Sequence, residues 1–124
     1  MYGVAKSIWL ILIAVVLMTY ANVAVKARAT ALGASGSASW LSYVLSMALD
    51  PWVWSAVIAA AVTGVLYIIA VRQLELSVAE PLFALVFVLV PLAAVVMLGE
   101  HLPPLRIAGL VLIFFGVILV EQTV

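Results

Sequence analysis

The chain has 124 residues, of which 69% are hydrophobic and 8% are charged, and its mean hydropathy is +1.44. A water-soluble domain carries roughly a quarter charged residues, so this composition indicates an integral membrane protein. Five basic and five acidic residues give a net charge of zero, which excludes the basic surface that nucleic-acid binding requires. The absence of cysteine excludes disulfides and thiolate metal sites.

A helix needs about 20 mostly apolar residues to cross the hydrocarbon core of a bilayer. By this measure we predict four membrane spans, at about 7–25, 52–71, 78–98 and 105–120. The expected fold class is all-α: residues 1–124 form a single transmembrane domain, an integral membrane four-helix bundle. No room remains for a soluble catalytic domain.

The first span begins after Lys6 and ends before Lys26. A cleavable secretory signal would also have a basic start, an apolar run and a small-residue stretch such as "ARATA" after it. This apolar run is longer than the usual ~7 to 15 residues, and polar Thr19, Tyr20 and Asn22 interrupt its end. A retained span is therefore the favoured interpretation.

Residues 31–50 lie between the first two spans. "TALGASGSAS" is rich in small residues and indicates a flexible connection, whereas "WLSYVLSMAL" is apolar but too short to span. Ser35, Ser39, Ser42 and Ser46 recur at helical spacing, a pattern typical of a helix that lies in the membrane interface. The alternative is that this segment lengthens the second span.

The second and fourth spans have clear start signals. Asp50 is a suitable N-cap, Pro51 suits the first helical position, and Trp52 and Trp54 fall where an aromatic belt is expected. In "GEHLPPLR", a glycine and paired prolines predict a break before the fourth span.

Lysine and arginine in the connections give a weak orientation signal. Lys6 and Arg72 fall on one side of the membrane, while Lys26, Arg28 and Arg106 fall on the other. Two against three is a small bias. It is compatible with a chain that inserts both ways and pairs antiparallel with itself, and equally with a chain whose orientation a partner decides.

Enzyme chemistry has little support. The single histidine, His101, stands beside Glu100 in a loop, and this pair is more typical of a solvated helix end than of a catalytic dyad. One histidine without cysteine provides too few ligands for a metal site, and no nucleophile motif or phosphate-binding loop is present. We expect no catalysis, metal or cofactor, which leaves movement of a substrate across or within the membrane as the default function.

Glu80 is the unusual residue of the third span. A charged side chain at the bilayer centre costs about 2.5 to 3.5 kcal/mol, so it usually faces a cavity or a partner. Alternatively, Ser77 and Glu80 have the spacing of a capping box, which would place the carboxylate near water at the start of the helix. Spacing alone leaves both interpretations open. Glu75, one turn earlier, is expected to be a solvated charge.

The last two spans, "SVAEPLFALVFVLVPLAAVVMLGEHLPPLRIAGLVLIFFGVILV", resemble the carboxy-terminal half of a repeat from the drug/metabolite transporter superfamily, with a third helix ending in "LGE" and a fourth of the form G-L-x-L-I-x-x-G-V. The start, "IWLILIAVVLMTYANVAVKARAT", is similar to the first helix of the small four-helix subunits that flip aminoarabinose-phosphoundecaprenol. In those subunits an I-W-L opening leads to a lysine close before an A-T pair, here Lys26 and Ala29-Thr30. Together the similarities cover nearly all of the chain except residues 31–50.

The resemblance implies roles for individual residues. In these subunits and in small multidrug resistance transporters, the third helix begins with a G-I-A-Y-like motif whose tyrosine faces a central chamber; Glu80 takes that position here. The resemblance to multidrug transporters is weaker in function, because those proteins exchange protons at a glutamate in the first helix. The first span here contains no acid, and the corresponding position falls near Met18. Gly109 and Gly116 match small residues through which the multidrug family dimerises, although packing within one chain would use them equally. Pro91 can supply the bend that glycines give in the relatives.

These observations predict a half-sized transporter of the bacterial inner membrane that works as a homodimer or as a heterodimer with a similar small subunit. Its expected cargo is a polyprenyl-phosphate-linked sugar or another amphipathic small molecule, whose head crosses a cavity lined by Glu80, Tyr20 and Asn22. Lys26 and Arg28 are expected either to attract the lipid phosphate or to act as ordinary headgroup anchors. A proton-coupled exporter of small cations and a non-transporting partner subunit of a membrane enzyme are the alternatives.

Overall fold

The computed structural model describes residues 2–34 and 39–124. The described residues form helices and no strands. The six helices are α1 (Tyr2–Ala34), α2 (Trp40–Leu49), α3 (Pro51–Ala70), α4 (Leu76–Phe83), α5 (Val86–Leu98) and α6 (Pro104–Glu121). The predicted all-α class is confirmed.

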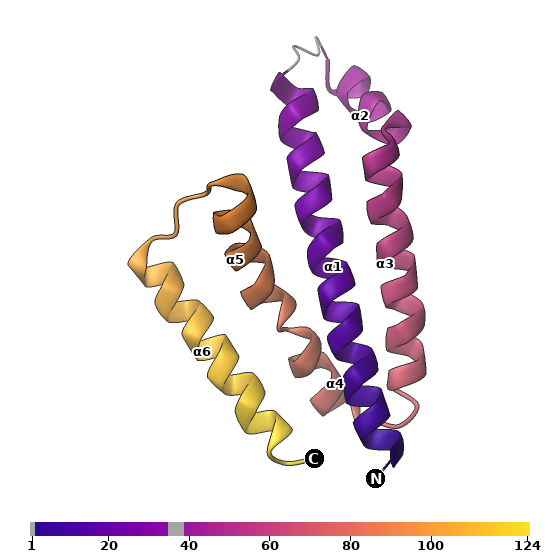
Figure 1. Cartoon of the computed structure of the whole chain (residues 1–124), viewed down its shortest axis with the longest axis vertical. Helices are drawn as coiled ribbons and strands as arrows, with labels where there is room; N and C mark the ends of the chain where they lie inside the picture. Colours follow the sequence, from indigo (N-terminus) through magenta and orange to yellow (C-terminus); the bar gives the residue numbers. More distant parts are fainter. Residues whose placement is uncertain (1, 35–38) are drawn as a thin grey trace.

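The helices run up and down and lie in the order α3, α1, α4 with α5, and α6, as Figure 1 shows. α1 and α3 are antiparallel and make the most extensive contact in the molecule. The third crossing, made of α4 and α5, packs against the other side of α1, and α6 packs against α4 and α5. Both chain ends lie at the same end of the molecule (Figure 1).

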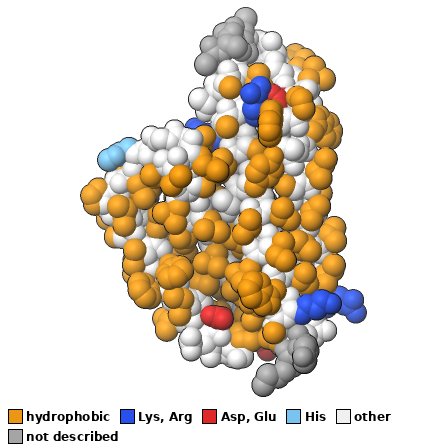
Figure 2. Space-filling model, in the orientation of Figure 1, with side chains coloured by type: hydrophobic (Ala, Val, Ile, Leu, Met, Phe, Trp, Pro, Cys, Tyr) orange, Lys and Arg blue, Asp and Glu red, His pale blue; other side chains and the backbone are white. Residues whose placement is uncertain are grey.

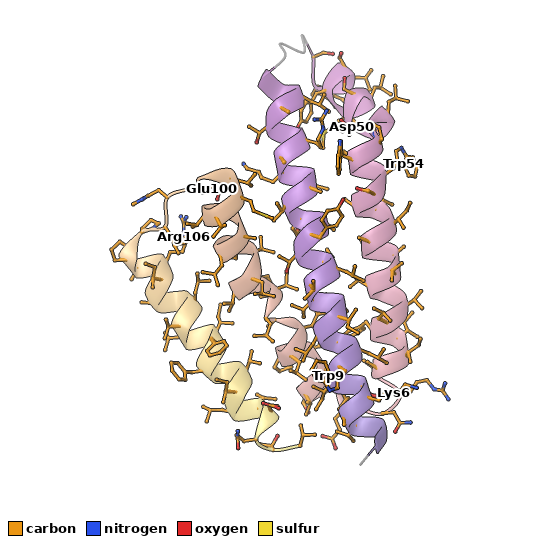
Figure 3. All side chains as sticks on the ribbon, in the orientation of Figure 1. Lys6, Trp9, Asp50, Trp54, Glu100 and Arg106 are labelled. Carbon is orange, nitrogen blue, oxygen red and sulfur yellow. The ribbon has the colours of Figure 1, made fainter. Side chains whose placement is uncertain are left out.

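Four segments are long and apolar enough to cross a membrane: Gly3–Gly33, Pro51–Ala70, Leu76–Leu98 and Pro104–Glu121. Figure 2 shows hydrophobic side chains over the middle of the molecule and charged ones toward its two ends. Lys6 and Trp9 lie near one end, and Asp50 and Trp54 near the other (Figure 3). Tryptophan is enriched at membrane–water interfaces, so the arrangement is that of a multi-pass membrane protein.

Small residues bring α1 and α3 close together. Ala14 and Ala59 are buried where the helices meet, and the hydroxyl of buried Thr63 lies 2.9 Å from the carbonyl oxygen of Ala59 and 3.3 Å from that of Ala14. Within a bilayer, close packing and interhelical hydrogen bonds drive helix association, because lipid tails are as apolar as the side chains. Fully buried Ile11 and Val15 continue this core toward α4.

α2 is a separate helix and does not lengthen α3. Asp50 has an extended backbone conformation (φ −79°, ψ 126°) that ends α2, and its side chain accepts a hydrogen bond from the Trp52 amide at 2.8 Å. The predicted cap at Asp50 and the proline at the start of α3 are confirmed. The short helix between the first two crossings is confirmed as well, and the alternative of a longer second span is wrong. Ser35, in the predicted serine pattern, lies outside the described residues.

The third crossing is interrupted at residues 84–85, between α4 and α5. Pro81 and Pro91 stand on either side of this interruption, each without an amide hydrogen to give to the helix. The amides of Phe87 and Val88 bond to carbonyls three residues back, as in a tightened turn. We predicted a bend from Pro91, but the structure places the interruption before it, and Pro91 itself lies inside α5.

The connection between α5 and α6 follows the predicted break. Gly99 ends α5 in the left-handed conformation (φ 68°), which glycine adopts without the penalty of a Cβ. Pro103 occupies the N-cap of α6, and Pro104 the first turn. The chain therefore turns sharply, and the connection between α5 and α6 lies in the same half of the molecule as α2, short of its end (Figure 1).

Candidate substrate-binding site

A groove of about 350 Å³ lies between α1, α5 and the start of α6. Its polar part is formed by Lys26, Glu100, His101 and Arg106, and Asn22 lies further along α1. The remaining lining residues are apolar: Val23, Val90, Pro91, Ala94, Val95, Leu98 and Leu102. The groove is therefore amphipathic.

Local structure explains how the polar groups meet. Asn22 and Lys26 are four residues apart on α1, so both side chains lie on one face of the helix. The Asn22 amide also donates to the carbonyl oxygen of Met18 at 3.0 Å. Glu100 and Arg106 come from the turn after α5 and the first turn of α6, in the same half of the molecule as Asp50 (Figure 3).

Lys26 and Arg106 are exposed, and neither forms an ion pair with a carboxylate of residues 2–34 or 39–124. Lys26 lies 20 residues after Lys6 on the same helix. At 1.5 Å per residue this separation is about 30 Å, the thickness of the hydrocarbon core. We therefore expect the polar end of the groove at the level of the lipid headgroups.

Arg28 has a different surrounding. Its Nε and Nη2 both lie 2.7 Å from Oδ2 of Asp50, a side chain only 5% exposed. Burial works to raise the pKa of Asp50, but hydrogen bonds from Arg28 and Trp52, together with the Arg28 charge, outweigh it and hold that pKa below its usual value. Arg28 thus ties the end of α1 to the start of α3; a part in binding a lipid phosphate stays a prediction.

Glu80 lies on α4, toward the opposite end from the groove's polar mouth. Its carboxylate accepts a hydrogen bond from the Tyr67 hydroxyl of α3, and the Tyr67 ring meets the Phe83 ring edge-on at 5.6 Å. The alternative capping box is not formed: α4 begins at Leu76, its N-cap is Glu75, and no side chain caps it. Glu80 is exposed on the protein surface, and its predicted place in a chamber stays a prediction.

Tyr20 faces α3. Its hydroxyl lies 2.8 Å from Oγ of Ser55, which itself donates to the Trp52 carbonyl at 2.6 Å, so Tyr20 is the donor in the pair. Ser55 and Tyr67 are 12 residues apart on α3, about 18 Å along the helix axis. Tyr20, Asn22 and Glu80 therefore have separate surroundings, and this conformation does not bring the three into one cavity.

Glu100, His101 and Arg106 were missed as lining residues in the sequence-based site. From the sequence, Glu100 and His101 were predicted to be a solvated helix end, and Arg106 was counted among the charges that set orientation. Their position follows from the turn at Gly99, which returns the chain to the level of Lys26. The lengths of the spans alone would have predicted that these residues lie at the same membrane depth as Lys26. They would not have predicted that the residues line one groove with it.

Gly109 and Gly116 lie on α6, seven residues apart, and both are exposed. A Cβ added at either position would have no atom of another helix within 4 Å. Space for a close approach of another helix is therefore present, and the dimer role stays a prediction. Across the described part of the chain, no three histidine, aspartate or glutamate side chains are grouped as metal ligands would be.

The chain is similar to proteins of Pseudomonas aeruginosa strains UCBPP-PA14, LESB58 and PAO1, each named "Probable 4-amino-4-deoxy-L-arabinose-phosphoundecaprenol flippase subunit ArnE". Each is 35% identical over 74 residues, which are 60% of this chain and 64% of the relative. The chain thus resembles bacterial flippase subunits. It matches less than two thirds of the length of these relatives. No family model and no solved structure matches it.

The predicted likeness to aminoarabinose-phosphoundecaprenol flippase subunits is confirmed by these relatives. Four apolar helices together with bacterial relatives of this kind support the predicted location, a multi-pass protein of the bacterial inner membrane. The same two findings fit a membrane transporter.

Proposed function

We propose that this protein is a non-enzymatic subunit of a transporter that moves a polyprenyl-phosphate-linked sugar, or a similar amphipathic lipid, across the inner membrane. The amphipathic groove between α1 and α5 is the observation that carries the proposal. A lipid-linked sugar has the same two parts, a polar head with a phosphate and a long apolar chain. The likeness to flippase subunits supports the same class of substrate.

In this proposal the head enters the groove at Lys26 while the chain stays in the bilayer. A second hollow of about 250 Å³ shares Asn22, Val90 and Pro91 with the groove and extends to Val86 and Phe87. The Asn22 amide therefore stands where the two hollows meet. A polar head that moves between the two hollows loses hydrogen bonds to water and can form one to the Asn22 amide instead. This hydrogen bond lowers the free-energy cost of moving the head into an apolar region.

Glu80 lies six residues before Val86, closer to the opposite interface. We propose that its carboxylate meets the head near the end of the crossing and recognises a cationic or hydroxylated group. Since Tyr67 already donates to it, the head must replace or share that hydrogen bond. Tyr20 takes part only if α1 and α3 separate enough to free its hydroxyl from Ser55.

A second small subunit completes the path in this proposal, either a copy of this chain or a similar one. The order of helices leaves α6 at one edge, with Gly109 and Gly116 uncovered. Small residues allow two helix backbones to approach closely in a bilayer. The path then forms between two chains, as between the repeats of larger transporters.

Reconstitution into proteoliposomes with a sugar-linked phosphoundecaprenol tests the function. We expect the labelled head to become accessible on the far side only when the protein, with any copurifying subunit, is present. Glu80→Gln should slow translocation by about tenfold, the loss of one charge-assisted hydrogen bond. Glu75→Gln, which changes a nearby exposed carboxylate, should not.

Unchanged translocation in well-folded Glu80→Gln protein would remove Glu80 from the path. Native mass spectrometry of the protein gently extracted from its own membrane gives stoichiometry and bound lipid together. A dimer with a polyprenyl-phosphate mass would support the proposal. A one-to-one complex with a larger enzyme, no such lipid and no translocation would instead make this chain a non-transporting partner subunit.

A further inference from the structure

Lys26 and Arg106 reach the same groove from different helices, α1 and α6. They are 80 residues apart in the sequence, and both are exposed and without an ion pair among the described residues. We propose that these two cations form a clamp for the phosphate of a single-chain lipid, whose chain lies between α5 and α6. This inference rests on the proposed function and names the groups that hold its substrate.

The contrast with Arg28 selects these two cations. Arg28 is held by Asp50 through two contacts of 2.7 Å, so a phosphate would have to compete with a buried carboxylate for it. Among the described residues, neither Lys26 nor Arg106 has a carboxylate oxygen within 4.0 Å. An arginine offers two parallel N–H groups to a phosphate, and a lysine adds a mobile positive charge. The phosphate therefore binds between Lys26 and Arg106 and not at Arg28.

A groove between α5 and α6 provides the place for the chain. It has a volume of about 480 Å³, and apolar side chains alone line it, among them Leu85, Leu89, Leu92, Val111, Phe114 and Phe115. Leu102 lines both this apolar groove and the cationic one. The two hollows therefore adjoin at Leu102, so one molecule can place its phosphate in the first and the part of its chain next to the phosphate in the second.

Glu100 and His101 line the mouth beside the two cations. The Glu100 carboxylate disfavours a free multivalent anion, while it accepts hydrogen bonds from a sugar hydroxyl or amine. A phosphate that carries a sugar on one side and a chain on the other fits these charges better than inorganic phosphate does. The clamp is thus directed at a lipid-linked phosphate.

The apolar groove and the exposed glycines lie on different sides of α6. Residues seven apart share one side of a helix, as Gly109 and Gly116 do. At 100° per residue, Val111 is turned roughly 160° and Phe114 roughly 140° away from Gly109. A chain bound against α5 and a second subunit at the glycines would not exclude each other.

Native mass spectrometry of the purified complex tests the clamp, with phosphoundecaprenol, undecaprenol, inorganic phosphate and phosphatidylglycerol as probes. Lys26→Gln and Arg106→Gln are compared with Lys6→Gln and Arg72→Gln, which remove the same charges at the opposite end. Val111→Trp, which fills the apolar groove, is compared with Leu112→Trp, which lies outside it. Circular dichroism checks that each variant is folded, and Lys26→Arg keeps the charge.

We expect phosphoundecaprenol binding to fall about tenfold in each clamp variant, to fall in Val111→Trp, and to stay unchanged in Lys26→Arg and in the controls. Undecaprenol and inorganic phosphate should bind more weakly than the phosphorylated lipid. Equal binding of undecaprenol, equal losses in Lys6→Gln and Arg72→Gln, or equally tight phosphatidylglycerol binding would each overturn the proposal.

The binding test separates this inference from the proposed function. If the lipid binds at Lys26 and Arg106 but is not translocated by the reconstituted protein, the clamp stands and the transport proposal fails. If translocation proceeds while both clamp variants bind phosphoundecaprenol like the unaltered protein, the transport proposal stands and the clamp is wrong.

Discussion

Truncating Ile11 and Ile13 separately measures what packing contributes to this fold. Both are isoleucines of α1, two residues apart, but Ile11 is 0% exposed and Ile13 is 48% exposed. Truncating a buried isoleucine to alanine costs about 2 to 5 kcal/mol in a water-soluble protein. Part of this cost, about 0.8 kcal/mol for each of the three carbons removed, is the lost free energy of transfer from water into the core. Helices that separate within a membrane remain in lipid, so the transfer part drops out. About 1 to 2 kcal/mol of lost packing then remains for Ile11→Ala.

We expect Ile11→Ala to lower the free energy of unfolding by that amount relative to Ile13→Ala, a factor of about 5 to 30 in the equilibrium constant. The assay is unfolding of purified protein in mixed micelles by increasing denaturing detergent, followed by circular dichroism. Both variants lose the same apolar atoms, so a general effect of lipophilicity cancels. Equal stabilities would show that Ile11 is not packed against α4, and the helix arrangement would be wrong.

Three further predictions use other parts of the structure. Thr63→Val removes the hydroxyl shared by the Ala59 and Ala14 carbonyls and should cost about 0.6 kcal/mol in the same detergent titration; a loss above ~2 kcal/mol would contradict this estimate of an interhelical hydrogen bond. Gly99→Ala should cost about 1 kcal/mol because its φ of 68° disfavours a Cβ, and Gly99→Asn should cost less; equal losses would indicate a steric cause instead. Burial raises the pKa of Asp50, but Arg28 and backbone amides lower it by more, so the net effect of folding is to lower this pKa. The ionised carboxylate therefore stabilises the fold above the unfolded pKa of about 3.9, and this contribution is lost as the pH falls below that value. Acid titration by circular dichroism should show this loss, and a decline as steep in Asp50→Asn would refute the assignment.

The four apolar helices could be predicted because the bilayer sets a minimum apolar length for a crossing helix, although α1 continues to Ala34, beyond the predicted end of the first span at about residue 25. The helix starts at Asp50 and Pro51 and the break at Gly99 were also predictable, since caps and turns depend on residues within a few positions of one another. The position of the short helix followed from an apolar run too short to span, but whether it joined α3 was decided by the backbone at Asp50.

The partners of the polar side chains could not be predicted. Apolar residues are spread around α1 without a clear helical periodicity, so no pattern indicates which face packs against α3 and which faces α5. Glu80 meets Tyr67 because α3 and α4 approach at that point, and its spacing from Ser77 suggested a capping box that the structure does not contain. Arg28 and Lys26 had the same predicted role in the sequence, but Arg28 forms an ion pair with Asp50 whereas Lys26 lines the groove.

The sequence by itself determined that this is a helical membrane protein, where its crossings lie and which ends carry its charges, because these properties depend on composition and local spacing. The tertiary structure alone decided that Lys26 and Arg106 share a groove while Tyr20, Asn22 and Glu80 lie apart. In a bilayer every helix face is compatible with lipid, so close packing of small residues, and not hydropathy, sets how the helices turn toward one another.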